Sequence, residues 1–446
     1  MLVREISLID GLISLLVIIF VVTIAYFIRP DSKKLYSKYY FPFIVAKISF
    51  AVLFVLIHVY YYKGGDTFLY FAGGNFFREQ FMASPQTYFK IMFSSFEDIR
   101  NIYFGQSFDV FYAFGSLDVF FMSKALSVFN ILTGGNYLAS SILFTIVTAI
   151  GVWKLYLSLC NLYPRLTKLF AIGILFYPSL GIWGSGILKD PLTLACVGFI
   201  FSSTQNLIQK KQIVLSTLTI ISSVLLCQIL KPYILYTFIP VILLWVQGKI
   251  NQNVSNSFLK FIITPIIILG FIGGGYIIIQ SVSKDAGKYS IENVQSVAEG
   301  FNSWHTYLAE TRNQSGYSLG TVEYTPTGIL EKSPQAFFVT YYRPFIIGDV
   351  RNVATLFEAV QNLILLLLTI YILFKVNPVK FIKLVSNNPE IRAFLIFSIT
   401  FGIAIGLTSY NFGALSRYKI PSLPFYVAFL IITYYEGDMK KKLSLK

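Results

Sequence analysis

Residues 7–28 read SLIDGLISLLVIIFVVTIAYFI, an apolar run that is followed directly by Arg29-Pro30. A helix needs about 20 apolar residues to cross a hydrocarbon core, because each backbone N–H must bond within its own segment there. The run is too long for the apolar core of a cleaved signal peptide, and it has no small-residue cleavage site. We therefore predict an uncleaved membrane helix.

Runs of the same kind recur along the chain. They fall near 41–62, 137–159, 167–185, 191–208, 213–230, 233–247, 259–281, 355–375, 392–409 and 420–436. Hydrophobic residues make up 55% of the chain and charged residues 13%, against roughly 25% charged in soluble domains. We predict an all-α polytopic membrane protein with about eleven transmembrane helices. The run 117–133 is short and holds Asp118 and Lys124, so we expect an interfacial or re-entrant helix there.

Positively charged residues gather in short loops between the apolar runs. These loops hold Arg29, Lys33, Lys34 and Lys38; Lys154, Arg165 and Lys168; Lys210 and Lys211; Lys249 and Lys260; Lys375, Lys380 and Lys383; and the tail with Lys440, Lys441, Lys442 and Lys446. Such positively charged loops stay on the cytoplasmic side of the membrane. All of them share that side only if the run 117–133 does not span the membrane. Topology thus accounts for most of the net charge of +15. The sequence has no basic stripe interleaved with aromatics, so we expect no nucleic-acid partner.

This membrane topology places the N-terminus outside and the C-terminus in the cytoplasm. It divides the chain into two N-terminal transmembrane helices at 1–62, an external loop with interfacial helices at 63–136, a transmembrane bundle at 137–281, an external loop or lid at 282–354, and C-terminal transmembrane helices with a basic tail at 355–446. The loop at 63–136 mixes aromatic and polar residues, which is typical of helices that lie in the membrane interface.

Asp66 is the first candidate for chemistry on the external face. It follows Gly64 and Gly65 directly after an apolar run, where a flexible backbone lets a carboxylate reach a site at the membrane surface. The alternative is that Asp66 caps a helix that begins at Thr67.

A Lys-Asp pair interrupts two apolar runs in residues 183–191, WGSGILKDP. Lys189 beside a helix N-terminus predicts a phosphate site. Asp190 followed by Pro191 is also a good helix start, with Asp as the cap and Pro at the first helical position. Lys231 repeats the arrangement before another proline, and its alternative role is to snorkel to the interface.

Two segments pair an arginine with aromatic residues beside apolar runs. Residues 341–345, YYRPF, contain Arg343, and residues 416–425, SRYKIPSLPF, contain Arg417 and Lys419. Arginine suits bidentate phosphate binding, and its aromatic neighbours can stack on a sugar. The alternative is that Arg and Tyr anchor the chain at the interface.

An acidic residue in the first large external loop and the late motif RYxxPxxPF at 417–425 make the chain resemble the GT-C superfamily of membrane glycosyltransferases, which use polyprenyl-phosphate sugars. Segment 334–362, with Arg343 and Glu358, is similar to a pattern in bacterial envelope-polysaccharide membrane proteins. The resemblance covers most of the chain in topology. It implies a polyprenyl-phosphate-linked sugar as partner and the bacterial cytoplasmic membrane as location, with an extracytoplasmic active face.

The resemblance also implies residue roles. Asp66 would act as general base or help to bind a metal, and Asp190 would be the second acidic residue. The phosphate-binding residues would be Lys189, Lys231, Arg343, Arg417 and Lys419, whose attraction for the leaving phosphate grows in the transition state. Contacts to the sugar or acceptor would come from Tyr70, Trp304, His305, Tyr342 and Tyr418. Many members have two adjacent acidic residues where this chain has Asp66-Thr67, so the use of a divalent metal, Mg or Mn, is left open.

Two other functions are compatible with the sequence. A repeat-unit polymerase or ligase also needs external arginines, and it favours a large late external loop such as 282–354. A transporter or flippase of lipid-linked saccharides would place ionisable residues at mid-membrane on broken helices, where His58 is the main candidate. The three cysteines lack metal-ligand spacing and the chain has only two histidines, which argues against a zinc or haem centre.

Overall fold

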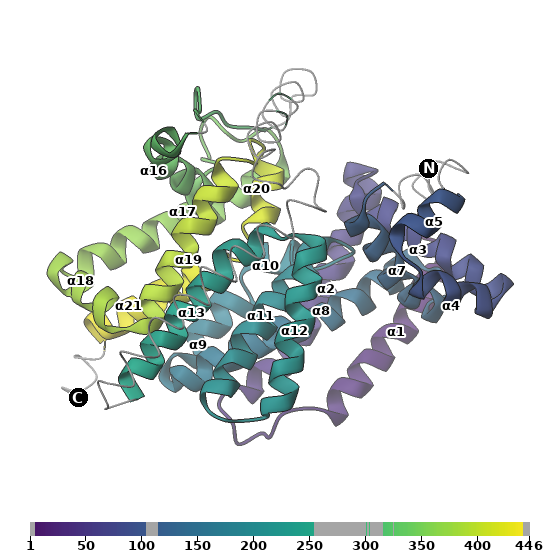
Figure 1. Cartoon of the computed structure of the whole chain (residues 1–446), viewed down its shortest axis with the longest axis horizontal. Coiled ribbons are helices and arrows are strands. Elements are labelled where there is room, and N and C mark those ends of the chain that lie inside the picture. The colour runs from purple at the N-terminus through teal and green to yellow at the C-terminus, as the bar shows by residue number, and fades with distance from the viewer. Residues whose placement is uncertain are drawn as a thin grey trace. The chain divides into compact units, whose positions relative to one another are not determined.

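The computed structural model describes residues 5–103, 115–253, 300, 303, 315–323 and 325–439, and every named element in this part is a helix (Figure 1). Within it, eight segments are long and apolar enough to cross a membrane. They are α1 (Leu8–Phe27), α2 (Tyr40–Leu56) with its flanking turns η1 (Ser37–Tyr39) and η2 (Ile57–Tyr62), α8 (Tyr137–Leu162), α11 (Lys189–Ile208), α12 (Ile213–Leu230), α13 (Tyr233–Asn253), α17 (Val353–Lys375) and α19 (Pro389–Gly406). This confirms the predicted class, an all-α multi-pass membrane protein.

The membrane-length helices expose large apolar side chains. Leu16 of α1 is 67% exposed, Val214 of α12 is 74% exposed and Leu367 of α17 is 57% exposed. Extended apolar surface of this kind marks an interaction or membrane-facing surface, since water would solvate it poorly. Around helices of membrane length, lipid is the surrounding that explains it.

Three expected spans are not among these eight. The run 167–185 is broken: after η3 (Pro164–Leu166), α9 (Thr167–Phe170) passes into the π-helix η4 (Ala171–Leu175), and α10 (Pro178–Ile182) starts separately. Pro178 explains that break, because a proline disfavours the helical conformation in the residue before it. The run 420–436 contains α21 (Leu423–Tyr434), which continues into the π-helix η7 (Tyr435–Met439). The run 259–281 lies outside the described residues, so the total of about eleven stays a prediction.

The run 117–133 forms α7 (Leu117–Leu132), which packs along α3 (Asp66–Ala83) and is not among the eight segments. With α4 (Pro85–Phe93) and α5 (Phe96–Tyr103) these helices enclose an apolar core: Phe77, Tyr88, Ile91, Ile99 and Phe120. Lys124 of α7 donates to the carbonyl oxygens of Met92, at 3.0 Å, and Ser94, at 3.1 Å. Burial lowers the pKa of Lys124 to about 8. The first external loop of the prediction is therefore a small helical cluster with its own core.

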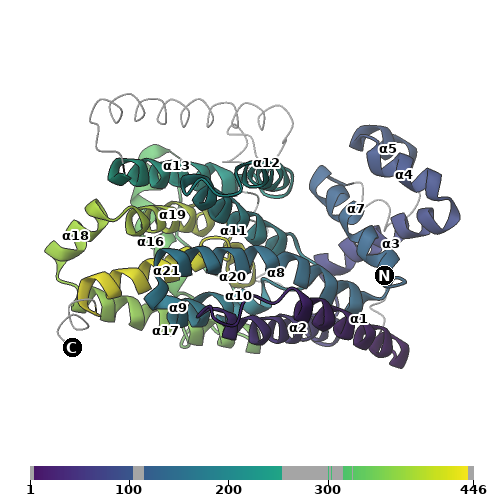
Figure 2. The same cartoon turned by 90° about the horizontal axis from the view of Figure 1, so that it is seen from below.

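The chain divides into two compact units, and the boundary passes within α11 and α12. Unit 1 comprises Met1–Phe199 and Ser222–Lys231, and unit 2 comprises Ile200–Ile221 and Pro232–Lys446. In unit 1, α8 packs against α1 and α2 (Figure 2). Small residues bring α8 and α11 together: a Cβ on Gly151 would lie 2.4 Å from the Cα of Ala195. Such close backbone contact is typical of membrane helices.

In unit 2, α19 packs against α13, α21 and α16 (Pro326–Tyr342), as Figure 2 shows. The core is aromatic: Phe201 stacks on Trp245 with ring centroids 4.6 Å apart and packs edge-on against Phe425. The short helices α18 (Pro378–Asn387) and α20 (Phe412–Tyr418) flank α19. An isolated bridge between Gly316 and Asn411 ties the segment before α16 to α20.

Candidate functional site

The candidate site of unit 1 is built on the turn 183–188, which leads from α10 into α11. Gly186 in this turn has φ +74°, and a Cβ there would lie 2.1 Å from the ring of Phe54. Glycine is therefore required both for the backbone conformation and for the close approach to α2. The helix α11 begins at Lys189, so Asp190 lies within its first turn rather than before it.

A lysine of α2 holds this turn. Lys47 Nζ donates to the carbonyl oxygens of Gly184, at 2.8 Å, and Leu180, at 3.3 Å, while the N–H of Gly186 donates to Thr145 Oγ1 at 2.7 Å. Lys47 is only 2% exposed inside a candidate membrane span, where burial of a charge is costly. Among the described residues it has no acidic partner. The carbonyl oxygens at the end of α10 stabilise its ammonium group instead.

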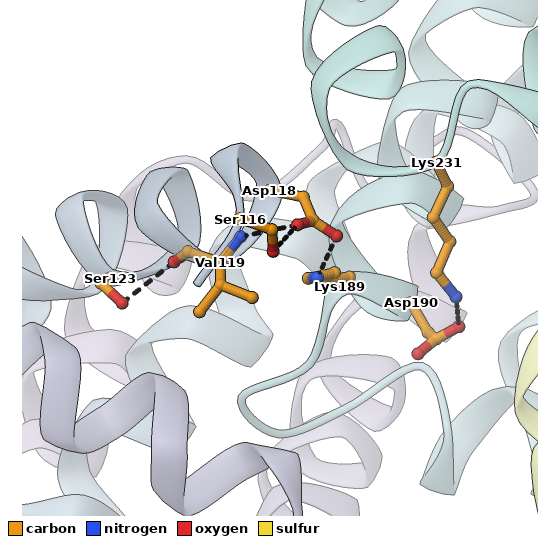
Figure 3. Close-up of polar contacts among 7 residues, drawn as sticks. All are labelled: Ser116, Asp118, Val119, Ser123, Lys189, Asp190 and Lys231. Atoms are coloured by element: carbon orange, nitrogen blue, oxygen red, sulfur yellow. Dashed lines mark hydrogen bonds and ion pairs between the residues drawn. The ribbon is translucent and has the colours of Figure 1, made fainter. Parts of the chain in front are cut away.

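Lys189 forms an ion pair with Asp118 of α7, with 2.5 Å between Nζ and Oδ2 (Figure 3). Asp118 also accepts hydrogen bonds from the N–H of Val119, at 3.0 Å, and from the hydroxyl of Ser116. The ring centroid of Tyr70 lies 5.3 Å from Lys189 Nζ, within the range of a cation–π contact. A residue of α3 and a residue of α7 therefore both contact this lysine.

The neighbouring residue, Asp190, takes a different partner. Lys231, which directly follows α12, places Nζ 2.5 Å from Asp190 Oδ1, and the two side chains are 9% and 1% exposed. Figure 3 shows the two pairs near each other, with Lys189 and Asp190 directed to separate partners. Lys231 thus lies in a buried ion pair rather than at a headgroup surface. The four charges of Asp118, Lys189, Asp190 and Lys231 balance.

Asp66 is the first residue of α3, and Gly65, with φ +120°, occupies the capping position. Asp66 is therefore not the cap of a helix that begins at Thr67. Tyr70 stands four residues further on, so it lies on the same face of α3 as Asp66. The ring of His58 adjoins the start of this helix, since a Cβ on Gly65 would lie 3.3 Å from His58 Cδ2.

In unit 2, Arg343 directly follows α16 and forms a two-point ion pair with Asp349. Its Nε donates to Asp349 Oδ2 at 2.8 Å, and its Nη2 donates to Oδ1. Burial alone would raise the pKa of Asp349, but hydrogen bonds from Arg343 and from the N–H of Phe345, with the charge of Arg351, lower it. Tyr342 is buried, and its hydroxyl bonds to that of Tyr426.

The second arginine segment of unit 2 contains a buried cation. Lys419 is 1% exposed, donates to Asn362 Oδ1 at 2.9 Å and lies 3.7 Å from Glu358 Oε2. Burial lowers the pKa of Lys419, and the carboxylate of Glu358 opposes that change. Arg417 and Tyr418 end α20, with the guanidinium carbon 6.0 Å from the Tyr418 ring centroid.

A cavity of about 650 Å³ opens beside Arg343 in unit 2. Its walls are mainly apolar and include Leu319, Phe338, Val339 and Phe345. Ligand pockets are typically about 300–1,000 Å³, so this cavity is large enough for a small molecule or part of a larger one.

The predicted site residues thus fall into two sets. Unit 1 holds Asp66, Tyr70, Lys189, Asp190 and Lys231, and unit 2 holds Arg343, Tyr342, Arg417, Tyr418 and Lys419. Trp304 and His305 lie outside the described residues. Within the described part of the chain, no group of three His, Cys, Asp or Glu side chains is placed to hold a metal ion.

Sequence reasoning missed three residues that build these sites. Asp118 and Lys47 are charged residues inside apolar runs, and this placement is the signal that could have found them, because such residues seldom lack a partner. Asp349 could have been found from its position six residues after Arg343.

Comparison with known proteins adds no further information. No protein-family model, no curated protein and no solved structure matches this chain. A proposal of function therefore depends on the residues and geometry of the chain itself.

Proposed function

We propose that this chain is a GT-C-like membrane glycosyltransferase. It transfers a sugar from a polyprenyl-phosphate-linked donor to an envelope glycan or lipid acceptor on the extracytoplasmic side of the bacterial cytoplasmic membrane. The observation that carries the proposal is the contact between Tyr70 and Lys189, because Tyr70 shares a face of α3 with Asp66. A carboxylate, an aromatic ring and a cation thus lie in one region of a membrane protein.

These groups have complementary roles in glycosyl transfer. The acceptor hydroxyl attacks the anomeric carbon, the bond from that carbon to the donor phosphate oxygen breaks, and the lipid phosphate leaves with the electron pair. Asp66 takes the proton of the acceptor hydroxyl as general base. Lys189 stabilises the charge that grows on the phosphate, and this attraction is stronger in the transition state than in the bound donor. Tyr70 holds Lys189 through its ring face.

The carboxylate is tested by Asp66→Asn, which keeps the shape of the side chain and removes the base. We expect turnover of a polyprenyl-phosphate-linked sugar to fall by about 100-fold or more, the usual scale for loss of a general base. Glu79→Gln on the exposed part of the same helix is the matched control and should be fully active. Near-normal activity of a folded Asp66→Asn variant would reject Asp66 as the base.

The resemblance also implies that Arg417 of unit 2 binds the lipid phosphate, and this role stays a prediction. Arg417→Lys keeps the charge but loses the planar fork of the guanidinium, so it should impair activity if Arg417 binds phosphate. An arginine that only anchors the chain at the interface tolerates the change, since either side chain can snorkel. A fully active Arg417→Lys variant would reject Arg417 as a phosphate-binding residue.

One observation favours a second function, a transporter or flippase of lipid-linked saccharides. Lys47 is a buried cation inside a candidate span, and the neighbouring segment 167–188 is broken rather than a continuous helix. Ionisable residues beside broken helices are typical of transporters. An assay in sealed liposomes that contain the purified protein and a labelled lipid-linked sugar distinguishes the two functions. Movement of the intact lipid across the bilayer without sugar transfer would favour the transporter.

A further inference from the structure

The short helix α18 joins two candidate spans of unit 2, α17 and α19. Asn377 caps the start of α18 and Asn388 caps the start of α19, and each asparagine is followed by a proline at the first helical position. A third span, α13, also ends here, since Gln252 donates to the carbonyl oxygen of Asn387 at 3.3 Å. A segment between two consecutive spans lies at a membrane surface, because irregular backbone exposed to lipid is not tolerated within the hydrocarbon.

One side of α18 is held against unit 2. Phe381 packs edge-on against Phe429 of α21, with ring centroids 6.2 Å apart. Lys380 donates to the carbonyl oxygen of Gly437 in η7. Figures 1 and 2 show α18 at the edge of unit 2. The helix is therefore fixed in orientation, and its other side faces outward.

The outward side of α18 has an apolar edge beside a polar edge. Val379 and Ile382 are 62% and 63% exposed, and residues three apart share one edge of a helix. Lys383 and Asn387, four apart, form the adjacent edge and are also exposed. Phe374, near the end of α17, adds a further exposed apolar side chain. This division into two edges suits the boundary between acyl chains and headgroups.

The charge near α18 is positive. Four cations lie in this helix or beside it in the sequence: Lys375, Lys380, Lys383 and Arg392. Residues 359–389 contain no acidic residue, and Glu390 is buried in an ion pair with Lys249. Glu436 and Asp438 of η7, which packs against α18, offset two of the four charges. The remaining positive charge attracts anionic headgroups.

We infer that the outward side of α18 binds the surface of an anionic phospholipid bilayer. Val379 and Ile382 lie among the upper parts of the acyl chains, and Lys375 and Lys383 contact the headgroup phosphates. Lysine stems cover apolar surface while their ammonium groups reach the headgroups, so both edges are satisfied at one depth. The predicted topology places these lysines on the cytoplasmic side, where the leaflet is anionic. This contact does not depend on sugar transfer.

The test measures contact with lipid in the full-length protein in nanodiscs. Ile382→Cys carries a fluorophore, and the three native cysteines are buried and so stay unlabelled. The quenchers are phosphatidylglycerol and phosphatidylcholine with a nitroxide on the upper acyl chain, each added at the same mole fraction to phosphatidylcholine. We expect phosphatidylglycerol to quench the label at least about twofold more than phosphatidylcholine does. Asn387→Cys on the polar edge is the matched control and should be quenched less by either lipid.

The lysines are tested in the same labelled protein. Lys375→Gln combined with Lys383→Gln should remove the excess quenching by phosphatidylglycerol and leave the quenching by phosphatidylcholine unchanged. Lys33→Gln combined with Lys34→Gln, in another positively charged loop, is the matched control and should keep the excess. All four lysines are exposed, so these substitutions leave the packing of the chain intact.

Three results would overturn the inference. Equal quenching by the two lipids would show that the helix does not select anionic headgroups. An excess that persists in the variant with Lys375→Gln and Lys383→Gln would show that these lysines do not bind the headgroups. A label at Ile382→Cys that neither lipid quenches would show that the apolar edge lies outside the bilayer, and crosslinking between copies from this position would assign the edge to a second copy of the chain.

Discussion

The Lys231–Asp190 ion pair of unit 1 and the Arg343–Asp349 ion pair of unit 2 join similar groups but differ in their exposure to solvent. Lys231 and Asp190 are separated by 41 residues and are 9% and 1% exposed. Arg343 and Asp349 are separated by only six residues and are 24% and 10% exposed. The Lys231–Asp190 pair joins the end of α12 to the start of α11. The Arg343–Asp349 pair lies within the short segment between α16 and α17.

The difference in depth predicts a difference in energy. Removal of one partner of a buried pair leaves an uncompensated charge, which costs about 3–5 kcal/mol. Removal of one partner of an exposed pair costs about 0–1 kcal/mol, because water solvates the remaining charge. The Lys231–Asp190 pair therefore contributes more to the stability of its unit than the Arg343–Asp349 pair does.

The largest effect is expected for Asp190→Asn. The substitution leaves the buried ammonium group of Lys231 without its carboxylate, so the free energy of unfolding should fall by about 3–5 kcal/mol. Thermal unfolding of the purified protein in nanodiscs measures the change. The double variant Asp190→Asn with Lys231→Met removes both charges and should recover most of the loss. A double variant as unstable as Asp190→Asn alone would show that the ion pair is not the cause.

A smaller effect is expected for Lys47→Met, which keeps the length of the side chain and removes its donor. The carbonyl oxygens of Leu180 and Gly184 lose a charged partner, a change of about 1.5–3 kcal/mol. Lys154→Met on the exposed side of α8 is the control and should change stability little. A reporter cysteine at Ser185, which is buried, should gain reactivity in Lys47→Met if the turn 183–188 loosens. Unchanged stability together with unchanged reactivity would contradict a positioning role for Lys47.

The sequence predicts those features of the fold that depend on residues close together along the chain. Apolar runs predicted the membrane helices, because the length of a spanning helix follows directly from bilayer thickness. The break in 167–185 was missed because an average over apolar residues does not detect Pro178 or a π-turn. Lys189 and Asp190 were found because a charged pair between apolar runs is unusual. The two ion pairs were not predicted, because Asp118 lies 71 residues from Lys189 and Lys231 lies 41 residues from Asp190, and only tertiary packing brings them close.

The smallest effect on stability is expected for a substitution of Asp349, and the pH dependence of this effect distinguishes its ion pair from the buried pair of unit 1. Its pKa is lowered in the folded state, against an unfolded value of about 3.9. The carboxylate therefore contributes stability that is complete above this unfolded value and is lost as pH falls through the lower folded value. Because the pair is partly exposed, Asp349→Asn should cost at most about 1 kcal/mol at neutral pH. The difference between wild type and variant should shrink as pH falls below about 4. Unfolding midpoints of both proteins across this range measure it, and a difference that does not vary with pH would show that Asp349 stabilises the turn through packing rather than charge.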